Sequence, residues 1–89
     1  IGACCYAFGD RDLDEMAERL GPTVRGRTRG SQPALDIAAG VEHVLDTLGR
    51  TMAVVDGTCT SCDKRYWSHR GTGTTRRQAM VAWIQTGER

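Results

Sequence analysis

The chain has 89 residues, of which 39% are hydrophobic and 26% charged, and its formal net charge is +1. This length suits a single domain over residues 1–89, and the composition is that of a globular chain rather than a disordered one. No apolar run reaches the roughly 20 residues of a membrane-spanning helix, so no transmembrane segment is predicted. The charge is unevenly spread, with eight acidic residues against five arginines in residues 1–49 and seven basic against three acidic residues in 50–89.

The first elements are a strand and a helix. Residues 1–8 form an apolar run that predicts a strand carrying Cys4 and Cys5. A helix is predicted over residues 10–20, with Asp10 as its N-cap. The apolar positions of this helix recur at i, i+3, i+4 and i+7, and they are Leu13, Met16, Ala17 and Leu20.

A polar segment and a second helix follow. Residues 23–32 hold three arginines and predict an exposed loop or a short edge strand, which is also a candidate contact for an acidic partner. A helix is predicted from Pro33, which suits a first turn, to Gly49, which supplies the stop. It carries one continuous apolar stripe, made of Ala34, Ile37, Ala38, Val41, Val44, Leu45 and Leu48.

The second half predicts a hairpin and a third helix. Residues 50–56 and 64–69 are predicted strands joined by a turn. The pattern Thr75-x-x-Gln78 is typical of a capping box and predicts a helix over residues 76–86, although the apolar run inside it also allows a buried strand. This order of elements predicts an α+β fold, a small two-layer sandwich with an antiparallel sheet and about three helices on one face, stapled by cysteines.

The cysteines fall in two pairs, Cys4 with Cys5 and Cys59 with Cys62. An even number of cysteines in a short chain indicates either a disulfide framework or a metal site. We expect two disulfides that join the early pair to the late pair, in an order left open, and we expect no bound metal and no cofactor.

The alternative is a zinc site. A CxxC knuckle such as Cys59-x-x-Cys62 resembles half of a zinc ribbon. All four cysteines could supply the ligands, or His69 could replace one of the early pair, and the expected set is Cys4 or Cys5, Cys59, Cys62 and His69. Neighbouring residues on an extended chain point to opposite faces, so the adjacent cysteines could share one ion only if the chain turned there. Such a module would bind nucleic acid or another protein.

A redox role receives less support. Residues 52–56 followed by Cys59-x-x-Cys62 resemble the strand-then-CxxC order of thioredoxins. A reactive cysteine of this kind sits at a helix N-terminus, whereas the residues after Cys62 predict a strand.

Basic and aromatic residues after the second cysteine pair predict a binding surface. Arginine and aromatic side chains anchor protein interfaces and also stack on bases. The alternative is that the aromatic residues belong to the core and the arginines form a solvated rim. The candidate binding residues are Arg65, Trp67, His69, Arg70, Arg76 and Arg77.

Catalysis is not predicted. Ser68 and His69 are neighbours and would point apart on a strand, so they cannot act as nucleophile and base. No phosphate-binding loop, GxSxG or HExxH motif is present in the sequence. We therefore expect a protein that acts by binding rather than an enzyme.

The leading hypothesis is a small, secreted, disulfide-stabilised protein of toxin or effector type, of the kind used in microbial virulence or killing. The first residue, Ile1, indicates a chain from which a signal peptide has been removed. Small killer toxins and secreted fungal effectors share this general design. The expected location is extracellular, and the expected partner is a host or competitor cell component, a protein or membrane surface more than a nucleic acid.

Overall fold

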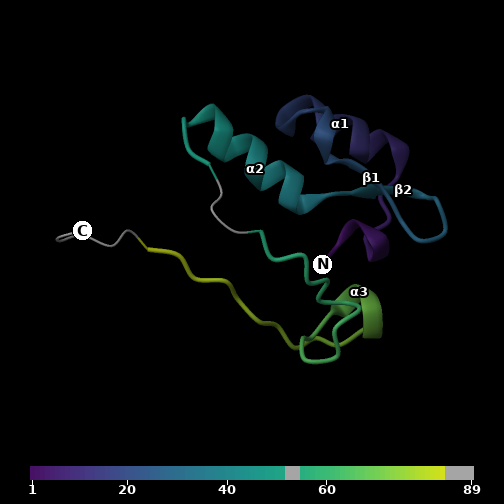
Figure 1. Ribbon diagram of the computed structural model, residues 1–89. Coiled ribbons are helices and arrows are strands. Elements are labelled where there is room, and N and C mark those ends of the chain that lie inside the picture. Colours follow the sequence, from purple (N-terminus) through teal and green to yellow (C-terminus); the bar gives the residue numbers. More distant parts are fainter. Residues whose placement is uncertain (52–54, 84–89) are drawn as a thin grey trace.

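The computed structural model describes residues 1–51 and 55–83 (Figure 1). The chain is α+β, with two antiparallel strands and three α-helices in this described part. The predicted two-layer sandwich is not confirmed. None of the described helices is long and apolar enough to cross a membrane. The elements in chain order are η1 (Ala3–Cys5), α1 (Asp10–Leu20), η2 (Pro22–Val24), β1 (Arg25–Arg27), β2 (Pro33–Leu35), α2 (Ile37–Thr47) and α3 (His69–Thr72).

Helix α1 confirms the prediction for residues 10–20. Gly9, with an extended backbone, is the N-cap, so Asp10 lies one position later and contributes with Asp12 to an acidic first turn. Acidic side chains stabilise this end of a helix because the unpaired N–H groups there carry partial positive charge. The helix ends at Gly21, whose φ of 89° lies in the region that favours glycine.

A short hairpin lies beside the N-terminal segment. Strand β1 pairs with β2 in antiparallel register, with Gly26 opposite Ala34. Ala7 forms an isolated bridge with Ala34 along the other edge of β2, and the N–H of Phe8 donates to the carbonyl of Pro33 at 2.9 Å. The predicted strand over residues 1–8 is therefore wrong except at this bridge. The edge-strand alternative for residues 23–32 is confirmed by β1.

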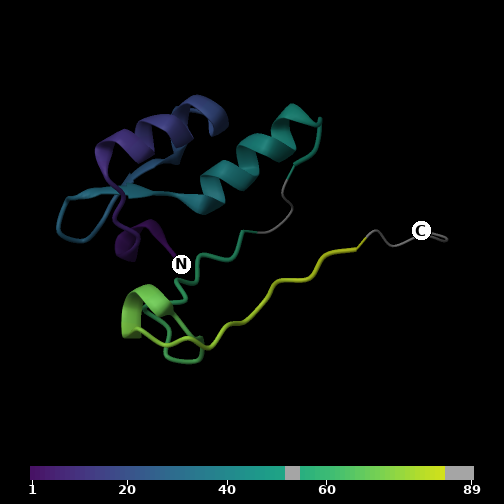
Figure 2. The same ribbon diagram turned by 180° about the vertical axis from the view of Figure 1, so that it is seen from behind.

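The core lies between α1, η2 and β2. Its buried members are Leu13, Ala17, Val24 and Leu35, and Val24 is completely buried. Tyr6, Phe8, Met16 and Leu20 pack against this cluster. Figure 2 shows the same layer from behind, with the N-terminal turn lying between it and α3. The core thus holds the N-terminal segment in place beside the second half of the chain.

Helix α2 begins four residues later than predicted. Asp36 is the N-cap, and its carboxylate accepts a hydrogen bond from the N–H of Ala39 at 3.1 Å. Pro33, which we expected in the first helical turn, begins strand β2 instead. The apolar stripe of α2 is only partly covered, because the exposed fractions of Val41 and Val44 are 43% and 42%.

The predicted hairpin and third helix are wrong. Residues 64–68 form turns and irregular backbone, and the described residues 74–83 are neither helix nor strand. Residues 52–54 of the first predicted strand and 84–86 of the predicted helix lie outside the described residues. The expected capping box fails because the side chain of Gln78 is bonded elsewhere. Its Oε1 accepts from the N–H of Trp67 at 2.9 Å, and its Nε2 donates to the carbonyl of Trp67 at 2.8 Å.

Candidate metal centre

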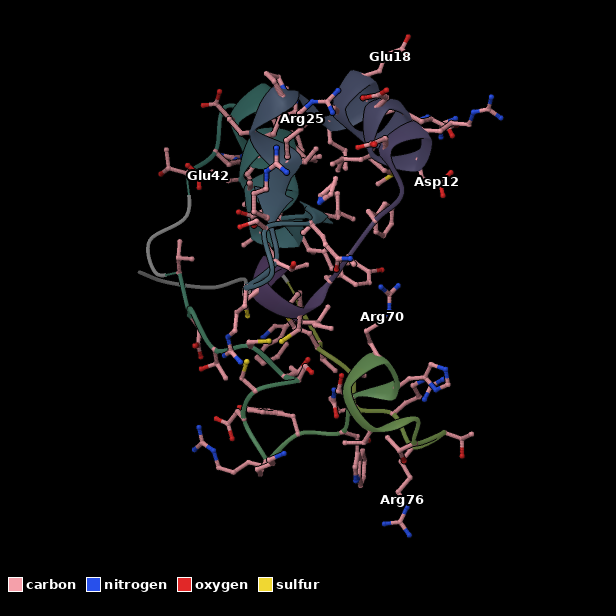
Figure 3. All side chains as sticks on the ribbon, turned by 90° about the vertical axis from the view of Figure 1, so that its right-hand side faces the viewer. Asp12, Glu18, Arg25, Glu42, Arg70 and Arg76 are labelled. Carbon is pink, nitrogen blue, oxygen red and sulfur yellow. The ribbon has the colours of Figure 1, made fainter. Side chains whose placement is uncertain are left out.

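The four cysteines meet in one cluster. The Sγ atoms of Cys4, Cys5, Cys59 and Cys62 all lie within 4.8 Å of one another. Figure 3 shows their yellow sulfur atoms gathered where the N-terminal turn meets the segment that follows α2. The chain thus brings together two pairs of sulfurs that are more than fifty residues apart in the sequence.

A tight turn makes the adjacent pair usable. Residues 3–5 form the 3₁₀ turn η1, closed by hydrogen bonds from the N–H of Cys5 to the carbonyl of Gly2 and from Tyr6 to Ala3, both 3.1 Å. Because a turn does not alternate sides as a strand does, both early thiols can face the same point. The objection that adjacent cysteines cannot share one ion therefore does not apply to this chain.

The late pair sits on a compact knuckle, residues 59–62. The N–H groups of Cys62 and Asp63 both donate to the carbonyl of Cys59, at 3.1 and 2.9 Å. Asp63 in turn binds Arg65 through several contacts, the shortest 2.7 Å, and this pairing lowers the pKa of Asp63 to about 2. These contacts fix the loop that carries both late thiols.

No two of the four sulfurs are at bonding distance. The Sγ of Cys62 lies 3.4 Å from that of Cys5 and 3.7 Å from that of Cys4, and Cys4 and Cys5 are 3.7 Å apart. A disulfide requires about 2.05 Å. All four cysteines are free thiols, so the predicted pair of disulfides is wrong.

The sulfur separations match those of a metal site instead. A tetrahedral ion with metal–sulfur bonds of about 2.3 Å places its sulfurs about 3.8 Å apart. The cluster confirms the ligand set of four cysteines and corrects the expected set with His69, because all four cysteines belong to it and His69 does not. The Nδ1 of His69 lies 3.0 Å from the carbonyl of Thr74.

Three thiols of the cluster have shifted pKa values, and that of Cys62 is raised, chiefly by its contact with the thiol of Cys5. Burial of Cys59 opposes its ionisation, but the N–H groups of Gly2, Cys62 and Ser61 donate to its sulfur and bring its pKa down to about 6. Burial and hydrogen bonds to the neighbouring sulfurs raise the pKa of Cys4 to about 12. Cys59 is therefore largely a thiolate at neutral pH, whereas a cation that enters the cluster must displace the proton of Cys4.

Arg29 lies against the cluster. Its side-chain Nη2 donates to the Sγ of Cys62 at 2.8 Å, and its backbone N–H donates to the carbonyl of Cys4 at 3.2 Å. The charges of Cys62, Cys4 and Cys5 raise the pKa of Arg29. The sequence placed this arginine in an exposed polar loop, and nothing in the local pattern connected it with sulfurs 24 to 33 positions away.

A second link between the halves lies beside the cluster. Arg70, on α3, donates from Nη1 to the carbonyl of Ala7 at 2.7 Å, and its guanidinium lies 4.7 Å from the centre of the Tyr6 ring. Figure 3 shows Arg70 and Arg76 extending in opposite directions.

The other predicted binding residues make contacts different from those of Arg70. Arg76 lies 5.9 Å from the centre of the Trp67 ring, and these two side chains do meet. Arg77 donates to the carbonyls of Thr74 and Arg76. Arg65 is engaged by Asp63. A binding role for these residues stays a prediction.

Comparison with known proteins gives similar curated relatives that share one name. The chain is 41% identical over 79 residues to a protein of Corynebacterium glutamicum named purine nucleoside phosphorylase, a match that covers 89% of this chain and 32% of that protein. Proteins of the same name from Mycobacterium bovis and Mycobacterium tuberculosis are 35% identical over 72 residues, covering 81% of this chain and 28% of theirs. The chain thus spans about a third of the length of these relatives. No family model and no solved structure matches.

These findings overturn the toxin or effector hypothesis. The similar proteins are named as phosphorylases, and the cysteines are arranged as a metal site rather than as a disulfide framework. The zinc alternative fits better, with the corrected ligand set. Secretion, removal of a signal peptide and the predicted cell-surface partner lose the support of the disulfides and stay predictions, as does nucleic-acid binding.

Proposed function

We propose that Cys4, Cys5, Cys59 and Cys62 bind one zinc ion, which joins the N-terminal turn to the knuckle of residues 59–62. The observation that carries this proposal is the approach of all four Sγ atoms to within 4.8 Å of one another. Four thiolates fill a tetrahedral zinc site completely and leave no position for water or substrate. The proposed role of the ion is therefore structural.

A single ion fits this cluster better than an iron–sulfur cluster does. In an iron–sulfur cluster the four cysteines are distributed over two or four iron atoms, and the inorganic core separates those on different irons. The Sγ atoms of Cys4, Cys5 and Cys62 lie 3.4 to 3.7 Å from one another, close to the separation of sulfurs around a single zinc ion, and that of Cys59 lies within 4.8 Å of them.

The ion would supply stability that the small core lacks. The fully buried core of the described residues is limited to a few side chains of α1, η2 and β2. The second half contributes almost none of it, so contacts such as those of Arg70 and Arg29 are what hold the knuckle to the N-terminal segment. Structural zinc contributes on the order of 10 kcal/mol to folding in small domains.

Zinc titration of cysteine and histidine variants tests this proposal. We expect wild type to bind one zinc ion, and Cys59→Ser and Cys62→Ser each to bind it at least a hundredfold more weakly. His69→Ala is the matched control, because His69 lies in the same segment but outside the cluster, and it should bind zinc as wild type does. Retained affinity in both serine variants, or loss of zinc in His69→Ala, would contradict the ligand set.

The comparisons favour a second function at the level of the whole protein. We propose that these 89 residues belong to a protein that cleaves purine nucleosides with phosphate, as the names of the similar proteins state for those proteins. Identity of 41% over 89% of the chain supports this. In this view the zinc centre is a structural part of the enzyme. This replaces our expectation of a protein without catalytic activity.

The assay for this activity uses the complete gene product that carries the 89 residues. With inosine and inorganic phosphate, we expect release of hypoxanthine together with ribose 1-phosphate, and no reaction when phosphate is omitted. Hypoxanthine released equally without phosphate would indicate a hydrolase, and no release from any purine nucleoside would contradict the proposal. Zinc binding is measured separately, so either proposal can fail alone.

A further inference from the structure

An apolar groove runs between α1 and α2. Its walls are the side chains of Met16 and Leu20 from α1 and of Ile37, Val41, Val44 and Leu45 from α2, and its volume is about 320 Å³. The floor is closed where Gly40 meets the core, since a Cβ at Gly40 would lie 3.3 Å from Leu20 and 3.4 Å from Val24. The groove is thus a continuation of the core surface that remains open on one side.

The open side exposes side chains that helices ordinarily bury. Ile37, Val41 and Val44 are 42%, 43% and 42% exposed, and they recur at the spacing of one helix face. Contiguous apolar patches of this kind on a protein surface mark places where another segment packs. Helix α2 therefore has an apolar face that is wider than the part that α1 and the core cover.

The helices around the groove are acidic. Helices α1 and α2, with the N-cap Asp36, carry eight acidic residues against two arginines. Asp14 and Glu15 are paired with Arg25 and Arg19, at 2.8 and 3.1 Å. The remaining acidic residues give this layer a negative field, which favours an occupant whose apolar residues are flanked by lysine or arginine.

We propose that the groove is filled by an amphipathic segment, apolar on one face and basic at its flanks, from the same polypeptide outside these 89 residues. The inference rests on the proposed relationship to the phosphorylases, because such proteins have about two thirds of their length outside the matched stretch. The groove would then be the contact through which the zinc-stapled module joins the rest of the enzyme.

One other occupant is available within the chain. Residues 76–83 carry Arg76 and Arg77 followed by Met80, Val81 and Trp83, which are 92%, 74% and 78% exposed. This segment of a second copy would also match an apolar groove between two acidic helices. The test must therefore separate a contact within one polypeptide from a contact between two.

Photo-crosslinking of the complete gene product distinguishes a contact within one polypeptide from a contact between two. Benzoylphenylalanine replaces Val41, and the control carries it at Glu42, the next residue, which is exposed and does not line the groove. A mixture of light and isotopically heavy protein shows whether a crosslink joins one polypeptide or two. We expect Val41 to give an intramolecular crosslink to an apolar segment outside the 89 residues, and Glu42 to give at least tenfold less of it.

Two outcomes would overturn the proposal. A light–heavy crosslink to residues 76–83 would assign the groove to a second copy, and no crosslink beyond the walls of the groove would make it a free surface. A check that needs no crosslinker is the melting temperature of the complete gene product. We expect Val41→Glu to lower it by several degrees and Glu42→Gln to leave it unchanged. Phosphorolysis is not part of either readout, so this inference can fail while the proposed activity stands.

Discussion

Arg70 reaches across the molecule to the N-terminal segment, where its guanidinium donates to the carbonyl of Ala7 at 2.7 Å and lies 4.7 Å from the centre of the Tyr6 ring. Arg70 and Ala7 are 63 positions apart in the sequence. Together with the cysteine cluster, this contact fixes the second half of the chain against the first.

Replacing Arg70 should weaken the contact between the second half of the chain and the N-terminal segment. We expect Arg70→Ala to reduce the free energy of unfolding by about 1 kcal/mol, because a charge-assisted hydrogen bond and a cation–π contact are lost together. Arg70→Lys should recover only part of the loss, since an ammonium cannot both stack on the ring and reach the carbonyl. Urea unfolding of the zinc-loaded protein measures these differences. Arg76→Ala, which removes only the longer contact with Trp67, is the matched control, and an equal loss in it would contradict the special role of Arg70.

Arg29 should strengthen metal binding through charge. A zinc ion with four thiolates carries a net charge of −2, and the guanidinium of Arg29 donates to one of those sulfurs at 2.8 Å. We expect Arg29→Gln to lower zinc affinity roughly tenfold, as loss of an outer partner of a metal ligand does. Arg29→Lys should lower it less. Competition with a chromogenic chelator gives the affinity, with Arg27→Gln as control because Arg27 bonds the carbonyl of Ser31 instead. Equal affinities in Arg29→Gln and wild type would show that the arginine is only a neighbour.

Zinc binding should weaken as the pH falls. Without metal, burial and the neighbouring sulfurs hold the pKa of Cys4 at about 12, so this thiol is protonated across the neutral range. Binding therefore releases protons, and a rise in proton concentration favours the metal-free state. We expect the apparent zinc affinity to fall by at least tenfold for each unit between pH 7 and pH 5. A chelator-competition series over that range measures the slope, and an affinity independent of pH would show that protonated thiols are not being displaced.

Helix α3 packs closely on the knuckle, so a side chain added at Gly71 should destabilise the fold. A Cβ at Gly71 would collide with the Oγ of Ser61 and lie 3.3 Å from its Cβ, whereas a Cβ at Gly57 would meet nothing within 4 Å. We expect Gly71→Ala to lower the unfolding free energy by about 1–2 kcal/mol, the usual cost of overpacking, and Gly57→Ala to have little effect. Thermal melts give both values. Adding Ser61→Gly to Gly71→Ala should restore most of the loss, and failure of this rescue would place the strain elsewhere.

The sequence predicted those elements whose signals are local. Helix α1 has acidic residues in its first turn, an apolar stripe and a terminal Gly21, and its bounds agree with the prediction. For α2, the predicted start was Pro33. Asp36 is the actual cap because the residues before it pair with β1 and with the N-terminal segment. That tertiary pairing is not visible in the periodicity of the helix.

The site was predictable in part. The two cysteine pairs were correctly expected to meet, but a sequence of two adjacent cysteines did not reveal the 3₁₀ turn that aims both at one point. Likewise, Gln78 matched a capping box and instead bonds the backbone of Trp67, so the helix predicted after it is replaced by extended backbone in the described residues. Arg29 was missed because its role depends on contacts with Cys4 and Cys62, which only the folded chain brings near.

The most direct test of the zinc centre is the native mass of the purified chain, prepared without reductant or chelator and followed by thiol alkylation under denaturing conditions. We expect one zinc ion per chain and four alkylated cysteines once the metal is removed. A metal-free mass four hydrogens below that of the reduced chain, with no thiol alkylated, would mean two disulfides and would contradict it.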